Sequence, residues 1–296
     1  MRVHAILVWF IPFVITAALI EGLLLSRRRG GYDWHAFFAS LGVVAGRQVI
    51  AWALPFALGG LLIRWAAAHR LFAIPLTAGW ALLLLFVGQE FFYYWYHRAN
   101  HRIRWFWATH RAHHSPNQLT FAAAYRLGWT GKLTGDLLFF IPLVWLGFPP
   151  AAVAVTLSAN LLYQFWLHAD WIPKLGWLEY VLNTPSHHRV HHAANPDYLD
   201  ANYGGVLIVF DRLFGTFVEE RGDVPCRYGL VRPVTSYNPL TIEFGEWIAL
   251  ARDIGKARSL QEVLGYLFRP PGWRPDGAGM TTEDVRRAAA LPEFCG

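Results

Sequence analysis

The chain has 296 residues, of which 55% are hydrophobic and only 16% are charged, with a formal net charge of +6. A soluble globular domain carries more charged residues than this, so the composition favours a membrane protein. The basic residues lie beside apolar runs and inside histidine clusters, where positive-inside placement explains them better than nucleic-acid binding.

Residues 1–75 contain two long apolar runs. The run Val3 to Leu25 is long enough to cross a hydrocarbon core about 30 Å thick, so we expect a retained anchor rather than a cleaved signal peptide. The run Trp34 to Ile63 carries Arg47 near its middle. Arg47 therefore marks an interface or a protein-lined cavity, or else only the second half, Ile50 to Ile63, enters the bilayer. We assign this region to transmembrane or interfacial helices.

Residues 76–220 form the expected catalytic domain. Leu76 to Tyr96 is an apolar segment that ends in an aromatic girdle and runs directly into His97. Later, two apolar arms flank a Gly-Pro breaker, which predicts a membrane hairpin over residues 137–166 that enters and leaves by one face. The hairpin would return His168 to the side where His97 begins.

Residues 221–296 are amphipathic and polar, and we expect a C-terminal cytosolic extension. The predicted fold class is therefore all-α: an integral membrane helical bundle with a cytosolic histidine-rich di-metal cap.

Ten of the thirteen histidines fall between His97 and His192. Residues i, i+3 and i+4 share one face of a helix, so motifs with this spacing direct two or three imidazoles at a common point. A single zinc takes about four ligands, and eight or nine imidazoles therefore indicate two metals with four or five ligands each. The motifs are His97-x-x-x-His101, His110-x-x-His113-His114, a lone His168, and His188-x-x-His191-His192.

Imidazole binds Fe, Zn, Cu and Ni alike, so the ligands alone do not name the metal. The sequence has no H-E-x-x-H, no E-x-x-H pair, no G-x-S-x-G elbow and no P-loop. Iron with oxygen is the chemistry that most needs such a centre at a membrane, where lipid C–H bonds are inert. His187 is expected outside the ligand set, because His188 begins the spaced pattern.

Four other residues are candidates for support of the ligands. Glu90 lies seven residues before His97 and shares its helix face, so it could hydrogen-bond a ligand imidazole or pair with a nearby arginine. Asn202 and Asp211 follow the last motif, where a loop-ordering role is favoured over ligand support. Gln164 precedes the lone histidine by four residues.

The order of these motifs, opening at the membrane end of an aromatic-rich helix, resembles the fatty acid hydroxylase and sterol desaturase superfamily. The likeness is stronger to its alkylglycerol monooxygenase branch and covers about Leu76 to Gly277. The stretches that carry it are Tyr93–Arg98, Tyr163–His168, Asn183–His192, Asn202–Leu207 and Asp211–Phe217.

The resemblance implies a membrane-bound di-iron monooxygenase that hydroxylates a lipid C–H bond with O2. In that branch the carbon next to an ether oxygen is hydroxylated, and the hemiacetal collapses to an aldehyde and a glycerol derivative. Tetrahydrobiopterin is the reductant there, whereas other relatives take electrons from a donor protein such as cytochrome b5. The implied ligands are His97, His101, His110, His113, His114, His168, His188, His191 and His192.

The chain departs from the family pattern in three places. Some relatives carry a histidine where this chain has Gln164, which bears on the ligand count at one metal. Animal members have an acidic residue directly after the first motif, where this chain has Arg102. Those members also have further C-terminal membrane spans.

Two other functions stay open. One is a sterol, carotenoid or fatty acyl hydroxylase or desaturase of the same superfamily, and the other is a membrane zinc-binding protein without turnover. If three spans precede His97 and the N-terminus lies outside, the basic runs Arg27–Arg29 and Arg98–Arg111 lie in the cytosol. Arginine far outnumbers lysine, a weak indication of a bacterial source, so we expect a metal site on the cytosolic face of a bacterial inner membrane.

Overall fold

The structure is a computed structural model that describes residues 4–27, 31–53 and 58–290. Within these ranges the chain forms helices and turns and no β-strand, which confirms the all-α prediction. The α-helices are α1 (His4–Leu25), α2 (Trp34–Ala53), α3 (Leu58–Ala68), α4 (Gly79–Arg102), α5 (Arg104–His110), α6 (Phe121–Ala124), α7 (Gly131–Thr134), α8 (Ile141–Leu146), α9 (Pro150–Phe165), α10 (Pro185–His191), α11 (Val209–Phe214), α12 (Pro239–Ile254), α13 (Leu260–Phe268) and α14 (Thr282–Ala290), and the 3-10 helices are η1 (Asp136–Phe140) and η2 (Gly176–Tyr180).

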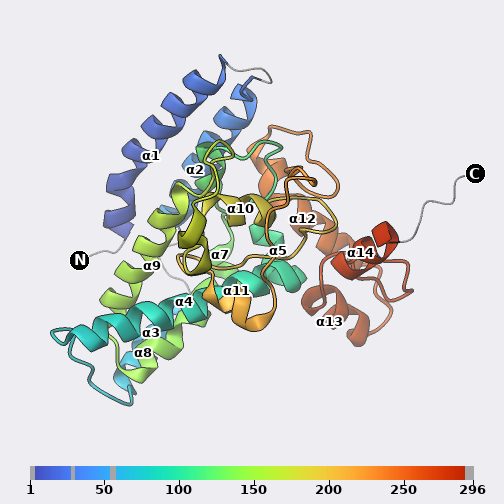
Figure 1. The fold of residues 1–296 in the computed structure, drawn as a ribbon. Coiled ribbons are helices and arrows are strands. Elements are labelled where there is room, and N and C mark those ends of the chain that lie inside the picture. Colours follow the sequence, from blue (N-terminus) through green and yellow to red (C-terminus); the bar gives the residue numbers. More distant parts are fainter. Residues whose placement is uncertain (1–3, 28–30, 54–57, 291–296) are drawn as a thin grey trace, which may run out of the picture.

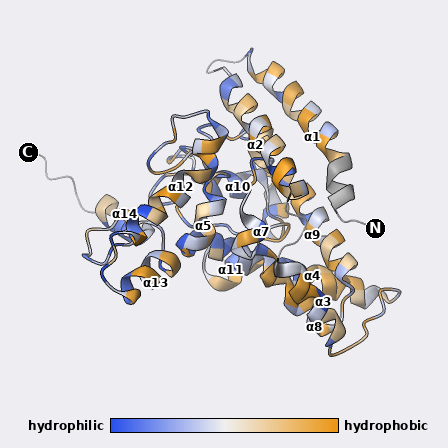
Figure 2. Cartoon of the chain, turned by 180° about the vertical axis from the view of Figure 1, so that it is seen from behind, coloured by the Kyte–Doolittle hydropathy of each residue, from blue (hydrophilic) through white to orange (hydrophobic). Residues whose placement is uncertain are grey.

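The N-terminal and C-terminal helices lie on opposite flanks of the molecule. Figure 1 shows α1 and α2 along one flank, α12 to α14 on the other, and α10 between them. Hydrophobic residues dominate the helices of the first flank, whereas hydrophilic residues are more frequent around α12 to α14 (Figure 2). The hydropathy therefore divides the chain into an apolar part and a more polar part.

One described helix, α2, is long and apolar enough to cross a membrane, judged by length and composition. Large apolar side chains point outward from the N-terminal helices, among them Phe38, Trp52 and Leu83, which are 63%, 86% and 64% exposed. An apolar surface of this extent is typical of lipid-facing helices. The basic residues Arg28 and Arg29 lie outside the described residues.

The structure bears on the two alternatives for Arg47. Helix α2 continues through Arg47 to Ala53, so the start of the segment Ile50 to Ile63 belongs to the same helix as the residues before Arg47. Residues 54–57 lie outside the described part. The Arg47 side chain is half-buried against the rest of the protein, which is compatible with the protein-lined environment.

The segment 136–165 folds as a helical hairpin. Gly147 ends α8 with a φ of 130°, and a Cβ at this position would lie 2.3 Å from the Phe72 carbonyl oxygen, so only glycine fits. Pro150 opens α9, where its missing N–H is no loss. Buried Leu85, Phe140 and other apolar residues join the hairpin to α4. The hairpin thus returns the chain to the end of α4 that carries histidines.

Candidate metal centre

Helix geometry sets the first histidine motif. His97 and His101 lie one turn apart on the last turns of α4. The extended backbone of Ile103, with φ −125° and ψ 117°, ends α4 and lets α5 fold back beside it. As a result His110, at the end of α5, brings its ring centroid within 4.9 Å of that of His97.

The remaining histidines come from α10 and the end of the hairpin. Pro185 occupies the first turn of α10, and this short helix carries His188 and His191, with His192 as its C-cap residue. His168 follows α9 by three residues. All nine predicted histidines therefore meet between α4, α5, α9 and α10.

The nine histidines divide into two adjacent clusters. His97, His101, His110, His114 and His191 form the cluster of five, and His113, His168, His188 and His192 form the cluster of four. Each H-x-x-H-H motif gives two imidazoles to one cluster and one to the other. The rings of His114 and His192, from different clusters, stack with centroids 4.3 Å apart.

The spacing between nitrogens fits metal coordination. In the cluster of five, His110 Nε2 lies 3.1 Å from Nε2 of both His97 and His114. In the cluster of four, His168 Nε2 lies 3.3 Å from His113 Nε2 and 3.0 Å from His188 Nε2. Two nitrogens that bind one metal at about 2.1 Å and at a right angle lie about 3.0 Å apart. The clusters thus have the dimensions of two metal sites.

The electrostatics of the clusters favour neutral imidazoles. Burial lowers the pKa of His114 and His192 well below the ordinary value, and the neighbouring imidazoles lower it further. Burial lowers the pKa of His168 to about 4. Neutral imidazole is the form that binds metals, so the site needs no deprotonation at neutral pH.

Two buried nitrogens of the cluster of five have no hydrogen-bond partner in the part of the chain that the structure describes. They are His101 Nε2 and His191 Nε2. A buried polar atom without a partner is costly, and a metal ion would satisfy both lone pairs. The donor set, consisting of imidazoles alone, is one that iron and zinc accept.

Partners on the other ring nitrogen fix the tautomer of several ligands. Nδ1 of His97 donates to the carbonyl of Tyr203 at 2.8 Å, and Nδ1 of His191 donates to that of Ala201 at 2.9 Å. Nδ1 of His168 likewise donates to the carbonyl of Gln164. A carbonyl only accepts, so Nδ1 holds the proton and Nε2 keeps the lone pair that a metal needs.

Asp211 and Asn202 order the loop that supplies these carbonyls. Asp211 accepts hydrogen bonds from the backbone N–H groups of Tyr203 and Gly204, both at 2.7 Å, and from Thr216 Oγ1. The Asn202 side chain donates from Nδ2 to the Val218 carbonyl and accepts at Oδ1 from the Val218 N–H. Neither residue contacts a cluster histidine side chain in these bonds, in line with the loop-ordering role.

Both interpretations of Glu90 were wrong. Its carboxylate bonds neither an imidazole nor an arginine; it accepts from Asn160 Nδ2 and from the backbone N–H groups of Val206 and Leu207. Glu90 and His97 lie on the same side of α4, but the Glu90 side chain is directed at α9 and at the loop that contains Val206 and Leu207. Gln164 bonds Asn160 and Tyr93, so its side chain continues this network beside the clusters.

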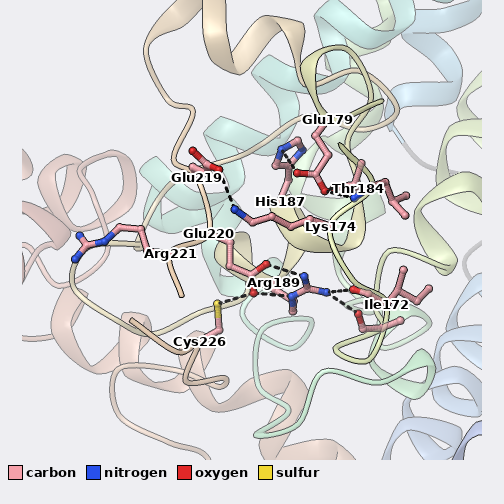
Figure 3. A network of polar contacts seen from close by, with 12 residues as sticks. Ile172, Lys174, Glu179, Thr184, His187, Arg189, Glu219, Glu220, Arg221 and Cys226 are labelled. Carbon is pink, nitrogen blue, oxygen red and sulfur yellow. Dashed lines mark hydrogen bonds and ion pairs between the residues drawn. The ribbon is translucent and has the colours of Figure 1, made fainter. Parts of the chain in front are cut away.

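The face of α10 opposite the clusters is held by ion pairs. Arg189 donates from Nε and Nη2 to both carboxylate oxygens of Glu220, at 2.7 and 2.6 Å, and from Nη1 to the carbonyls of Ala169 and Ile172 (Figure 3). His187 lies outside both clusters, 3.9 Å from Glu179. Arg189 thereby ties α10 to the segment that follows His168.

Three residues that touch or position ligands were not predicted. Asp200 lies 3.4 Å from His101 Nδ1, Tyr203 offers its carbonyl to His97, and Arg189 anchors α10. Asp200 carried a sequence signal, because an acidic residue in the loop after a histidine motif can support a ligand. The contact of His97 with the backbone carbonyl of Tyr203 is not predictable from the pattern of side chains, because every residue has a backbone carbonyl.

Part of the chain matches a known protein family. The model described as fatty acid hydroxylase matches residues 82–216. Alkylglycerol monooxygenase from Xenopus tropicalis is 39% identical over 207 residues, covering 70% of this chain and 46% of that protein. The Homo sapiens alkylglycerol monooxygenase is 35% identical over 267 residues, covering 90% of this chain and 59% of that protein. Ornithine lipid hydroxylase OlsE from Rhizobium tropici is 34% identical over 140 residues, covering 46% and 41%.

The chain spans about half the length of the curated relatives it matches. No solved structure matches it.

Proposed function

Because residues 82–216 match the fatty acid hydroxylase family, we propose that this chain is a membrane-bound di-iron monooxygenase that hydroxylates a lipid C–H bond with O2. The observation that carries the proposal is the convergence of nine mostly buried histidines on two adjacent points. A structural zinc site needs about four ligands, so a pair of all-imidazole sites indicates a dinuclear centre.

The nine histidines would hold the two irons through Nε2. Iron bound there supplies the redox chemistry that activates O2. The carbonyls of Tyr203, Ala201 and Gln164 hold the protons on Nδ1 of their partner imidazoles, and Arg189 keeps α10 in place. The chain's own contribution is therefore a buried ligand set that is held in place and needs little reorganisation during the reaction.

For the substrate we propose an alkylglycerol ether, on the strength of the alkylglycerol monooxygenase relatives. One oxygen atom of O2 would enter the C–H bond next to the ether oxygen, and two electrons and two protons would reduce the other atom to water. The resulting hemiacetal would break its ether C–O bond to give an aldehyde and the free glycerol hydroxyl. Tetrahydrobiopterin is the proposed reductant, with an electron-donor protein as the alternative partner.

For the location we propose an integral membrane protein with the metal centre on the cytosolic face of a bacterial inner membrane. Apolar side chains exposed on the helices before His97 support the membrane, and the basic run from Arg98 to Arg111 supports the cytosolic face. The alkylglycerol monooxygenases in the comparison are eukaryotic, so the bacterial source rests on the arginine excess alone.

A second candidate keeps the chemistry and changes the lipid. The ornithine lipid hydroxylase and a putative methylsterol monooxygenase from Dictyostelium discoideum, 29% identical over 147 residues, act by name on other lipids. Hydroxylation of an acyl chain or a sterol would leave a stable alcohol, whereas ether hydroxylation yields an aldehyde. The product therefore distinguishes the two.

The test uses the full chain purified in detergent. Iron content is measured first, and O2 uptake and aldehyde release are then followed with alkylglycerol and tetrahydrobiopterin. We expect about two irons per chain and ether-dependent uptake that His114→Ala abolishes. The matched control is His187→Gln, since His187 is buried nearby but outside both clusters. Protein that holds only zinc and consumes no O2 with any lipid or reductant would refute the proposal.

A further inference from the structure

His101 differs from the other cluster histidines in its Nδ1 partner. His97, His168 and His191 donate to backbone carbonyls, whereas the Nδ1 of His101 lies 3.4 Å from Oδ1 of Asp200. Among the described residues, no other cluster histidine has a carboxylate within ion-pair distance. One imidazole of the cluster of five is thus supported by a side chain.

Asp200 sits in a loop that needs external support. Its φ is 54° and that of Asn202 is 56°, in the left-handed region that residues other than glycine seldom adopt. Such a backbone persists when its surroundings hold it. The side chain of Asp200 is 11% exposed, and its Oδ2 accepts from Arg102 Nη1 at 3.0 Å. The carboxylate therefore bridges the ligand His101 and the next residue of the same helix.

Helix α14 supplies the external support. Glu283 pairs with Nη2 of Arg102, and Arg286 donates to the carbonyls of Pro196 and Leu199. Helix α14 lies far along the chain from α4, on the flank occupied by α12 and α13 (Figure 1). Its polar contacts converge on the loop 196–200.

We propose that Asp200 is a positioning residue for His101 and that α14 is a strap that holds Asp200 in place. The inference rests on the proposed metal centre and adds to it a function for the C-terminal segment. In this arrangement the Asp200 carboxylate, 3.4 Å from His101 Nδ1, would accept a hydrogen bond from Nδ1–H, so that Nε2 keeps its lone pair for a metal and the imidazole is a stronger ligand. The buried, unpartnered Nε2 of His101 is consistent with that orientation.

The expected loss of metal binding depends on how buried the removed side chain is. Removing a carboxylate that supports a metal-bound histidine weakens metal binding roughly 10- to 100-fold. Asp200→Asn keeps an acceptor oxygen and loses the charge, so it should fall between Asp200→Ala and the wild type. Glu283 is 44% exposed, and loss of such a surface pair should weaken binding only roughly two- to fivefold.

The experiment measures two properties of the full chain in detergent. One is the rate at which a chelator removes bound Fe²⁺ under anaerobic conditions, and the other is amide hydrogen exchange in residues 196–202. The variants are Asp200→Ala, Asp200→Asn and Glu283→Ala. The matched control is Arg287→Ala, because Arg287 lies on the same helix, is 74% exposed and pairs within the helix with Asp284. Far-ultraviolet circular dichroism checks that each variant is folded.

We expect faster iron loss in the order Asp200→Ala, Asp200→Asn, Glu283→Ala, and faster exchange of residues 196–202 in Glu283→Ala but not in Arg287→Ala. Wild-type rates of iron loss in both Asp200 variants would overturn the positioning role, and unchanged exchange in Glu283→Ala would overturn the strap. If the wild type binds no metal, the proposed function fails, while the exchange data still decide whether α14 orders the loop.

Discussion

Glu90→Ala should destabilise the protein strongly, because one buried carboxylate accepts three hydrogen bonds from two separate segments. Oε1 accepts from Asn160 Nδ2 at 2.6 Å, and Oε2 accepts from the backbone N–H groups of Val206 and Leu207 at 2.7 and 2.9 Å. Glu90 is 1% exposed, so water does not replace the lost acceptor without entering the core. The change leaves three donors without a partner.

A buried donor left without a partner costs about 1–3 kcal/mol, so three donors should cost about 3–6 kcal/mol in the free energy of unfolding after partial relaxation. Glu90→Gln should be far milder. Its amide oxygen can accept from both backbone N–H groups, while the Asn160 and Gln164 amides turn over and the Tyr93 hydroxyl rotates, so each group keeps a partner. Only the charge of the acceptor is lost, which should cost about 1–2 kcal/mol.

The assay is denaturant unfolding of both variants and the wild type in one detergent, with bound iron measured on the same samples. Iron should fall in Glu90→Ala more than in Glu90→Gln, because the network joins the loop beside His97 to α9, which leads to His168. Equal unfolding free energies for the two variants, or a loss below about 1 kcal/mol in Glu90→Ala, would refute this reasoning.

Three further predictions follow from the site. His114→Ala and His188→Ala, one from each cluster, should each lower the iron content from about two per chain towards one, measured by elemental analysis; a loss of neither iron would contradict the assignment to two sites. The free energy of unfolding of the metal-free protein should fall as the pH is lowered from about 6.5 to about 4, by about 1.4 kcal/mol per unit for each depressed histidine such as His168, because the unfolded chain binds protons that the folded chain excludes. Melting curves across that window check this, and a rise in stability would refute it. Glu220→Ala should cost about 2–4 kcal/mol by leaving the Arg189 guanidinium without its carboxylate, whereas the double variant with Arg189→Met should recover part of the loss in thermal unfolding.

Local sequence spacing predicted the helices well and the histidine faces only in part. The apolar arms around Gly147 form the hairpin between α8 and α9. The H-x-x-H-H motifs were expected on one helix face each, but α5 ends at His110, so His113 and His114 lie in the turn that follows it. The partners of Glu90 were not predicted: a ligand imidazole and a nearby arginine were the two alternatives, and the carboxylate bonds Asn160 and the backbone of Val206 and Leu207 instead. A face spans a wide arc, and which neighbour covers each part of it depends on α9 and the loop 203–207, which the local pattern does not contain.

The sequence by itself predicted the all-helical architecture and a count of eight or nine imidazoles that indicates two metals, because helical spacing and ligand chemistry are local properties; the set of nine histidines came from the family resemblance. Only the tertiary structure decided how the imidazoles are shared. His113 belongs to the cluster of four although His110 and His114 of the same motif belong to the cluster of five, and His191 belongs to the cluster of five. Only the fold brings Asp200 and α14 to His101. These contacts join residues far apart in the chain, and their partners are chosen by packing rather than by spacing.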